Sequence, residues 1–100
     1  MQNTQIVELS DYKIKNMHLD ILTPERKIFN GDVYGVLLPG VAGYFELLDN
    51  HAPIVAALGK GQLKILKDKS TTEIYNIEGG FVEMNSNKTI VLIEGAETVV

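Results

Sequence analysis

From residue 17 onward, the chain consists of short segments in which apolar and polar positions alternate with a period of two. In the first segment Met17, Leu19 and Ile21 alternate with His18 and Asp20, which is the pattern of a half-buried β-strand. Further strands are predicted over residues 26–29, 33–38, 44–48, 54–58, 62–67, 72–77, 81–84 and 89–93. No apolar stripe with helical spacing persists for ten residues after residue 16, so the pattern predicts an all-β protein.

Glycine, proline, asparagine and aspartate separate these segments, and they are the residues that favour turns. Pro24 is expected to end the first strand, since it lacks the N–H that a strand ladder needs. Asn30 to Asp32 is predicted to form a turn in which Gly31 takes a positive φ. Gly35, inside an apolar run, predicts a bulge or the close approach of another backbone. Residues 81–84 and 89–93 are predicted to pair as a hairpin.

Turn signals every eight to twelve residues are typical of an antiparallel sandwich or barrel. The segments over residues 33–38 and 90–93 are apolar on both faces, and a single sheet would leave one of those faces exposed. We therefore predict an all-β, two-sheet antiparallel β-sandwich, a flattened barrel of about eight to ten short strands, over residues 17–97. Residues 1–16 are interpreted as an N-terminal extension, and residues 97–100 as a segment that follows the last strand.

The formal net charge of −4 argues against a nucleic-acid or anionic-lipid surface, which would need a basic face. There is no cysteine, so the chain can form neither a disulfide nor a thiolate metal site. No apolar run approaches the ~18–20 residues that cross a bilayer, and the N-terminus lacks the features of a signal or transit peptide. We expect a protein on the cytoplasmic side that reaches any membrane only through protein partners.

No catalytic or ligand-binding constellation is visible. His18 and His51 are the only histidines, and their separation fits no metal-binding motif. His18 is expected to face solvent or a cross-strand partner, and His51 to cap a turn or contact a protein. The carboxylates are scattered and form no acid–base pair. Residues 40–43 are not a phosphate loop, because no Lys-Ser/Thr and no helix follows them. We expect no catalytic residue, metal, cofactor, nucleotide or small-molecule substrate.

The order and spacing of several short motifs resemble the β-domain of the epsilon subunit of rotary F-type ATP synthases over about four fifths of the chain. The motifs are His18 to Ile21 followed by Pro24 and Glu25, Phe29 to Gly31, Leu38 to Gly40 with Gly43, His51 to Pro53, Gly61, and Gly79 to Phe81. The resemblance implies a β-sandwich at the foot of the central stalk. It implies a non-catalytic rotor subunit that couples the gamma subunit to the c-ring during proton-driven ATP synthesis.

The same resemblance implies the contacts with both partners. The loop that contacts the c-ring corresponds to Gly40, Val41, Ala42, Gly43 and Tyr44. The positions that face gamma correspond to Thr23, His51 and Ala56. Family members commonly carry acidic residues where Ala42 and Tyr44 stand, so a more apolar ring contact is expected here. The location implied is the cytoplasmic face of the bacterial inner membrane, as a peripheral part of the F1 sector.

Epsilon subunits often continue into two C-terminal helices that inhibit rotation and, in some members, bind ATP. This sequence stops just after its last predicted strand, so we expect neither a helical brake nor a nucleotide site. The alternative function is a small-ligand or carbohydrate-binding sandwich, although Trp is absent and the two histidines are far apart. A third possibility is an adaptor that adds a strand to its target.

Overall fold

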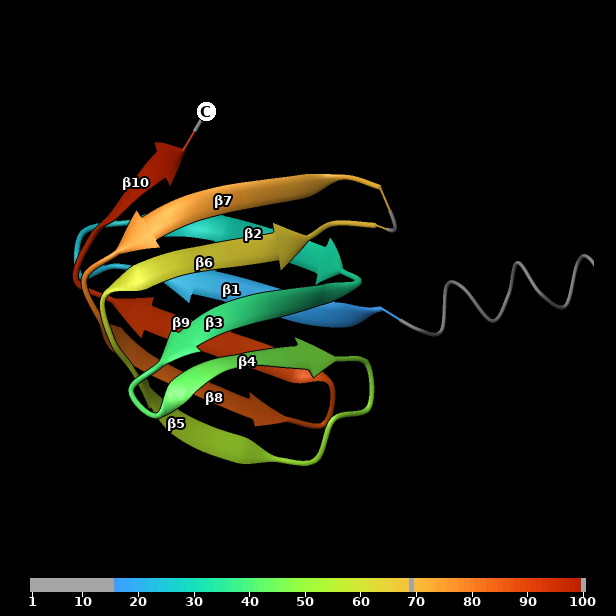
Figure 1. Cartoon of the computed structure of the whole chain (residues 1–100). Coiled ribbons are helices and arrows are strands. Elements are labelled where there is room, and N and C mark those ends of the chain that lie inside the picture. The colour runs from blue at the N-terminus through green and yellow to red at the C-terminus, as the bar shows by residue number, and fades with distance from the viewer. Residues whose placement is uncertain (1–15, 69, 100) are drawn as a thin grey trace, which may run out of the picture.

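The computed structural model describes residues 16–68 and 70–99, which form ten short strands (Figure 1). These are β1 (Met17–Leu22), β2 (Lys27–Val33), β3 (Gly35–Gly40), β4 (Gly43–Leu48), β5 (Ile54–Leu58), β6 (Gly61–Leu66), β7 (Thr72–Ile77), β8 (Gly80–Asn85), β9 (Lys88–Ile93) and β10 (Ala96–Val99). Within the described residues, no helix has the length and apolar character to cross a membrane. The extension predicted for residues 1–16 lies outside the described part of the chain, apart from Asn16.

The strands form two layers. The front sheet has the order β4-β3-β6-β7-β10 and faces the viewer in Figure 1, and the back sheet has the order β5-β8-β9-β1-β2. The layers are joined where Gly40 of β3 pairs with Leu58 of β5. This arrangement confirms the predicted all-β sandwich. Among the described strands only β1 and β9 pair in parallel, which is possible because no tight turn connects them.

The core lies between the two layers and is almost entirely apolar. Every second residue of the central strands points into it, as the period-two pattern requires. The largest fully buried side chains are Met17, Leu19, Ile21, Leu38, Leu47, Leu63, Ile65, Ile77 and Met84. The buried Thr89 hydroxyl donates a hydrogen bond to the Met17 Sδ (3.5 Å), so this polar group also has a partner. Such close packing of two interlocked faces makes the sandwich stiff.

Two sequence predictions about strand limits are wrong. Asn30 to Asp32 forms no turn, because β2 runs through it and Gly31 pairs with Leu19 of β1. The ladder to β1 satisfies this backbone, and the chain bends only at Tyr34. The second error is β10, which was not predicted as a strand. It has four residues and is fixed by its antiparallel pairing with β7, a partner distant in sequence.

Two other predictions are confirmed. A Cβ at Gly35 would lie 2.4 Å from the Leu48 Cδ2 and 2.9 Å from the Leu47 carbonyl oxygen, so the close approach is real. Strands β8 and β9 form the predicted hairpin around Ser86 and Asn87. Both of these residues have positive φ (53° and 62°), as a two-residue type I′ turn requires.

Because each strand runs the length of the sandwich, successive connections alternate between its two ends (Figure 1). The β1–β2, β3–β4, β5–β6, β7–β8 and β9–β10 connections lie at one end, which we call the tip end. The β2–β3, β4–β5, β6–β7 and β8–β9 connections lie at the opposite end, which we call the polar end. The residues predicted to contact partners are divided between these two ends.

Candidate functional site

The β3–β4 hairpin forms a short apolar tip. Gly40 pairs with Gly43, so only Val41 and Ala42 make the turn, and Val41 is 70% exposed. The tip is anchored to the neighbouring connection by two main-chain hydrogen bonds, Val41 N to Ala57 O (3.1 Å) and Gly59 N to Pro39 O (2.7 Å). The exposed Val41 is therefore held in place by main-chain hydrogen bonds to the neighbouring segment.

Tyr44, the last residue of the predicted ring contact, lies across the front sheet. Its hydroxyl accepts a hydrogen bond from the Gln62 main-chain N–H (3.0 Å). A Cβ at Gly61 would lie 2.6 Å from that hydroxyl and 2.9 Å from the Pro39 Cβ, so glycine is needed where the tyrosine crosses β6. The ring remains 57% exposed. Gly40 to Tyr44 thus form one continuous, mostly apolar surface.

Thr23, predicted to face gamma, closes the β1–β2 turn at the tip end. Its hydroxyl accepts hydrogen bonds from the main-chain N–H groups of Arg26 (3.1 Å) and Glu25 (3.3 Å). The Thr23 main-chain N–H in turn donates to the Arg26 carbonyl (2.9 Å). The polar atoms of Thr23 are therefore used within its own turn, in the manner of a Ser/Thr turn.

His51 lies at the opposite, polar end, in the connection between β4 and β5. The His51 main-chain N–H donates to the Leu48 carbonyl (3.1 Å), and Nδ1 lies 2.7 Å from the Ala52 carbonyl oxygen, to which it donates. The imidazole is exposed. The expectation that His51 caps a turn is thus confirmed, and its ring edge remains available to a protein partner.

Asn87 holds this connection against the back sheet. Its side-chain Oδ1 accepts from the Asn50 main-chain N–H (2.7 Å), and its Nδ2 donates to the Asp49 Oδ1 (2.6 Å). Its carbonyl oxygen accepts from the His18 main-chain N–H (3.0 Å). Asn87, in a positive-φ turn, thus bonds β1 through its main-chain carbonyl and the crossover from front to back sheet through its side chain.

Ala56, the third residue predicted to face gamma, is half-buried on β5 and packs against the core. Its neighbour Val55 points outward and is 74% exposed. Thr23, Ala56 and His51 do not converge on one point, since Thr23 and His51 lie at opposite ends of the sandwich. On the outward face of β5 the exposed side chain is that of Val55, which was not predicted from the sequence as a contact residue.

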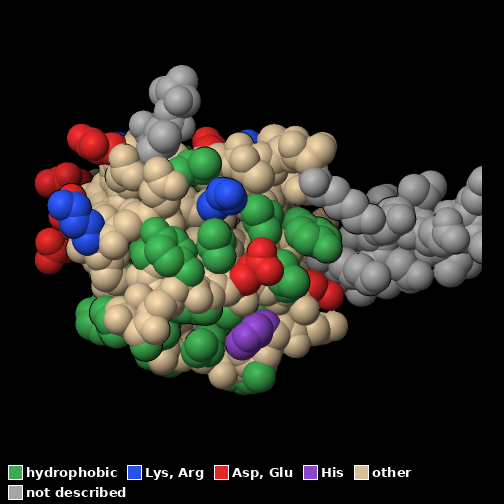
Figure 2. Space-filling model, viewed as in Figure 1, with side chains coloured by type: hydrophobic (Ala, Val, Ile, Leu, Met, Phe, Trp, Pro, Cys, Tyr) green, Lys and Arg blue, Asp and Glu red, His purple; other side chains and the backbone are tan. Residues whose placement is uncertain are grey.

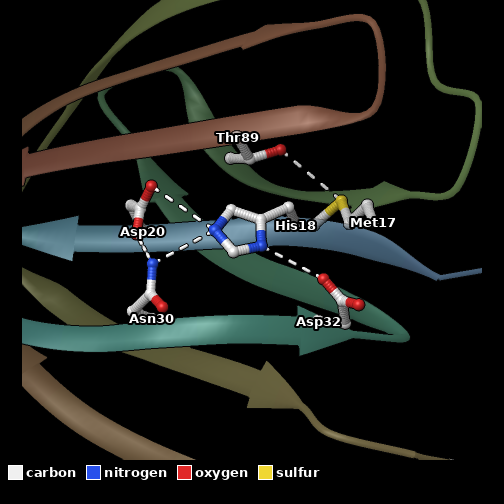
Figure 3. Close-up of polar contacts among 6 residues, drawn as sticks. All are labelled: Met17, His18, Asp20, Asn30, Asp32 and Thr89. Atoms are coloured by element: carbon white, nitrogen blue, oxygen red, sulfur yellow. Dashed lines mark hydrogen bonds and ion pairs between the residues drawn. The ribbon is translucent and has the colours of Figure 1, made fainter.

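A polar cluster surrounds His18 on the outer face of β1 and β2 (Figure 3). His18 Nδ1 lies 3.1 Å from the Asp32 Oδ1, while Nε2 lies 3.1 Å from the Asn30 Nδ2 and 3.6 Å from the Asp20 Oδ2. Asn30 Nδ2 also donates to Asp20. The network assigns the ring proton to Nδ1, which donates to Asp32, while Nε2 accepts from Asn30. His18 therefore has the cross-strand partners that its polar position predicts.

This cluster has no metal-site geometry, because the two carboxylates flank opposite nitrogens of one ring. Across residues 16–68 and 70–99, no group of three or more His, Cys, Asp or Glu side chains is placed to hold a metal ion. The arrangement around His18 can hold β1 against β2 and bind solvent. It contains no two groups that are directed at one common substrate position.

Among the described residues two ionisable groups have a shifted pKa, and both shifts have a structural cause. Hydrogen bonds from the Ser70 main-chain N–H, then from Thr71, lower the pKa of the Asp68 carboxyl in the β6–β7 turn. Burial, then the charge of the neighbouring Glu73, raises the pKa of the Tyr75 phenol. Neither group lies beside an acid–base partner in a cleft, so neither shift points to catalysis.

Hydrophobic side chains are exposed on both outer faces. Figure 2 shows them gathered over β3, β4 and β6 on the front sheet, where Tyr44 and Leu48 are the most exposed. On the back sheet the exposed apolar side chains are Val55, Phe81 and Leu92. In the sequence these residues alternate with residues that are buried, and this alternation predicted that their side chains point outward. Only the order of the strands in each sheet places these side chains near one another. Exposed apolar outer surfaces of this kind are typical of binding and assembly modules.

Comparison with known proteins defines this class further. Residues 16–99 match the family described as "ATP synthase, Delta/Epsilon chain, beta-sandwich domain", and the chain belongs to this family. The "ATP synthase epsilon chain" of Chlorobium limicola is 40% identical over 80 residues, which are 80% of this chain and 91% of that one. The predicted resemblance to epsilon subunits is thereby confirmed, and the carbohydrate-binding alternative is displaced.

Solved structures share the fold at lower identity. A chain of the Euglena gracilis mitochondrial ATP synthase, from a structure of OSCP, F1 and the c-ring, superposes with a TM-score of 0.79 at 20% identity over 83% of this chain. A chain of the Tetrahymena thermophila mitochondrial ATP synthase central stalk and c-ring gives a TM-score of 0.71 at 17% identity over 81% of this chain. The matches cover 53% and 65% of those longer chains.

Proposed function

We propose that this chain is a non-catalytic rotor subunit of an F-type ATP synthase, in which it joins the gamma subunit to the c-ring. Membership of the epsilon family carries the proposal, and the stiff sandwich with a fixed apolar tip provides the physical basis. A body that does not bend transmits torque between two partners, so proton-driven rotation of the ring reaches catalytic sites on other subunits. No residue of the chain has to carry a proton or form a bond in this role.

The ring contact is assigned to the tip, Gly40 to Tyr44. Val41 is the most exposed side chain there, and its main-chain bond to Ala57 holds it in place. Val41 and Ala42 carry no charge, so the contact is apolar rather than ionic. Burial of a valine side chain contributes about 1.5 kcal/mol or more, which corresponds to roughly a ten-fold change in affinity.

We place the gamma contact on the back sheet, which carries Thr23 in the β1–β2 turn at one edge and Ala56 on β5 at the other, with His51 in the connection that precedes β5. Since Ala56 faces the core, Val55 supplies the exposed apolar side chain of this contact. A permanent contact with both partners would bury on the order of 2,000 Å². The complex would sit at the cytoplasmic face of the bacterial inner membrane, and the chain would attach there only through its partners.

Two matched valine substitutions test the division of the two contacts. Val41→Asp should weaken binding to purified, detergent-solubilised c-ring about ten-fold or more and leave gamma binding unchanged. Val55→Asp should do the reverse, because it removes an equally exposed valine from the other surface. Both side chains are exposed, so the unfolding midpoint should not move. Wild-type protein that binds neither gamma nor the ring in this assay would refute the proposal.

A further inference from the structure

The outer face of the front sheet carries an apolar surface that belongs to neither assigned partner contact (Figure 2). Leu37 of β3 pairs with Glu46 of β4 and with Lys64 of β6, so these three side chains form one row across the sheet. Their chain neighbours, such as Val36 and Leu47, are buried in the core, so the row points outward. The surface, which we call the front patch, consists of this row and the apolar side chains beside it, Leu48, Leu66 and Ile74.

The shape and charge of the front patch limit what can cover it. Leu48 is 36% exposed, and the other apolar side chains of the patch are half-buried. Such a shallow surface suits a single chain segment better than a second subunit, because a stable protein interface takes about 800 Å² from each partner. Glu46 and Lys64 lie two strand spacings apart, about 10 Å. Neither forms an ion pair within the described part of the chain, so the patch favours an occupant with apolar residues and charges of both signs.

The described part of the chain begins close to this patch. Met17 pairs with Val33, and the next residue, Tyr34, donates its main-chain N–H to the Leu66 carbonyl oxygen (2.8 Å). Two contacts between strands therefore lead from the start of β1 to a residue of the front patch. At about 3.3–3.6 Å per residue, the fifteen residues that precede Asn16 can span roughly 50 Å, which is several times the width of the patch.

The sequence of residues 1–15 has the composition that the front patch favours. Apolar residues and charges of both signs alternate there at short intervals, at Ile6, Val7, Glu8, Leu9, Asp11, Tyr12, Lys13, Ile14 and Lys15. Counted back from β1, Tyr12 and Ile14 come first and reach the polar end of the patch at Leu48 and Leu66. Asp11 and Lys13 then come level with the charged row.

We propose that residues 6–14 dock on the front patch, where Lys13 lies beside Glu46 and Asp11 lies beside Lys64. A segment attached to the domain acts at an effective concentration on the order of millimolar, so a contact of modest affinity is enough to hold it. Docking there covers the front patch with residues of the same chain and leaves the tip and the back sheet free. The inference goes beyond the assigned gamma and ring contacts and does not require either to be correct.

Introduced cysteine pairs test this position directly, because the chain contains no cysteine of its own. Lys13→Cys with Glu46→Cys places two thiols at the proposed contact. Lys13→Cys with Glu83→Cys is the matched control, since Glu83 is also an exposed carboxylate but lies on the outer face of the back sheet. A disulfide needs Cα atoms within about 7 Å of each other. Under mild oxidation the front pair should form an intramolecular disulfide at least ten-fold faster than the control pair.

Two results of the cysteine experiment would overturn the proposal. Equal rates for the two pairs would show that residues 6–14 have no preference for the front sheet. A disulfide-linked dimer as the main product of the front pair would place these residues on a second copy of the chain. Reducing and non-reducing gels at several protein concentrations distinguish the two products.

Charge reversal tests the ionic part on the full, ¹⁵N-labelled chain. Lys13→Glu places like charges at residues 13 and 46, so it should shift the amide signals of residues 64–66 across the patch. Adding Glu46→Lys restores an opposite pair and should return those signals to their wild-type positions. Lys88→Glu is the control, because it reverses an exposed charge on β9 of the back sheet and should leave them unchanged.

Signals of residues 64–66 that ignore Lys13→Glu, or that stay shifted in the double variant, would contradict the proposed pairing. None of these measurements bears on gamma or ring binding, which is measured separately.

Discussion

The connections at the two ends of the sandwich reverse the direction of the chain by different means. The tip end contains seven of the nine glycines, at positions 40, 43, 59, 61, 79, 80 and 95, so its reversals depend on backbone freedom and close main-chain approach. The polar end uses side chains, because Asn87 and Asp68 accept or donate the hydrogen bonds that hold its connections. The tip end thus leaves apolar side chains free for partners, while the polar end satisfies its own polar groups.

The largest loss of stability is expected from a substitution at Gly80, at the tip end. Gly80→Ala places a Cβ 2.1 Å from the Leu92 carbonyl oxygen at a residue whose φ is +156°. β8 must move away from β9, and we expect a loss of at least about 3 kcal/mol in the free energy of unfolding. Urea denaturation followed by circular dichroism measures the loss.

Substitutions at two other tip-end glycines distinguish the destabilisation caused by a close contact from that caused by backbone strain. Gly43→Ala has open space but a φ of +131°, so strain alone should cost about 1–3 kcal/mol. Gly95→Ala meets neither obstacle and should remain within about 1 kcal/mol of the wild type. Equal effects at Gly80 and Gly95 would contradict the role assigned to main-chain packing at this end.

At the polar end the corresponding position is Asn87. Asn87→Gly keeps the positive φ of 62° but removes the side-chain bonds to Asn50 and Asp49, so we expect a loss of about 1–2 kcal/mol in unfolding free energy. Asn87→Ala adds the cost of a left-handed backbone and should lose about 1 kcal/mol more. The same urea measurement applies, and a glycine variant as stable as the wild type would show that the crossover needs no side-chain support.

A smaller effect is expected at Asp68, and it depends on pH. The folded-state pKa of this carboxyl is lowered, so its stabilising contribution is present above its ordinary value of 3.8 and is lost as the pH falls through the folded-state pKa. Asp68→Asn keeps an acceptor but not the charge. Its melting temperature should lie slightly below that of the wild type at pH 7, and the difference should vanish in acid. A difference that grows on acidification would show that the sign is wrong.

Most of the fold could be predicted from the sequence because most strands have a local pattern of alternating apolar and polar residues. Period-two alternation and turn residues gave strands β5 and β7 their observed limits. The errors arose where pairing with another strand, and not local composition, decides the backbone conformation. The Asn30–Gly31 pair has the composition of a turn, yet β1 supplies a ladder that keeps it extended, and β10 exists only because β7 offers a free edge.

The candidate surfaces were less predictable than the fold. The exposed tip at Val41 followed from its place between two glycines, and family resemblance pointed to it. The predicted hairpin already brings Phe81 next to Leu92, but the position of β5 and its exposed Val55 beside β8 could not be found from sequence, since it depends on the pairing of β5 with β8. The link from Asn87 to Asp49 joins residues 38 positions apart, and no local pattern signals such a contact.

The central claim, a stiff link between gamma and the c-ring, is tested most directly by restoring coupling. Membranes that contain an F-type ATP synthase depleted of its epsilon subunit would receive this chain, and ATP-driven proton uptake would be measured against ATP hydrolysed. The wild-type chain should restore proton uptake per ATP, and Val41→Asp should require about ten-fold more protein for the same recovery. Saturating binding of the wild-type chain without any recovery of proton uptake would contradict the account.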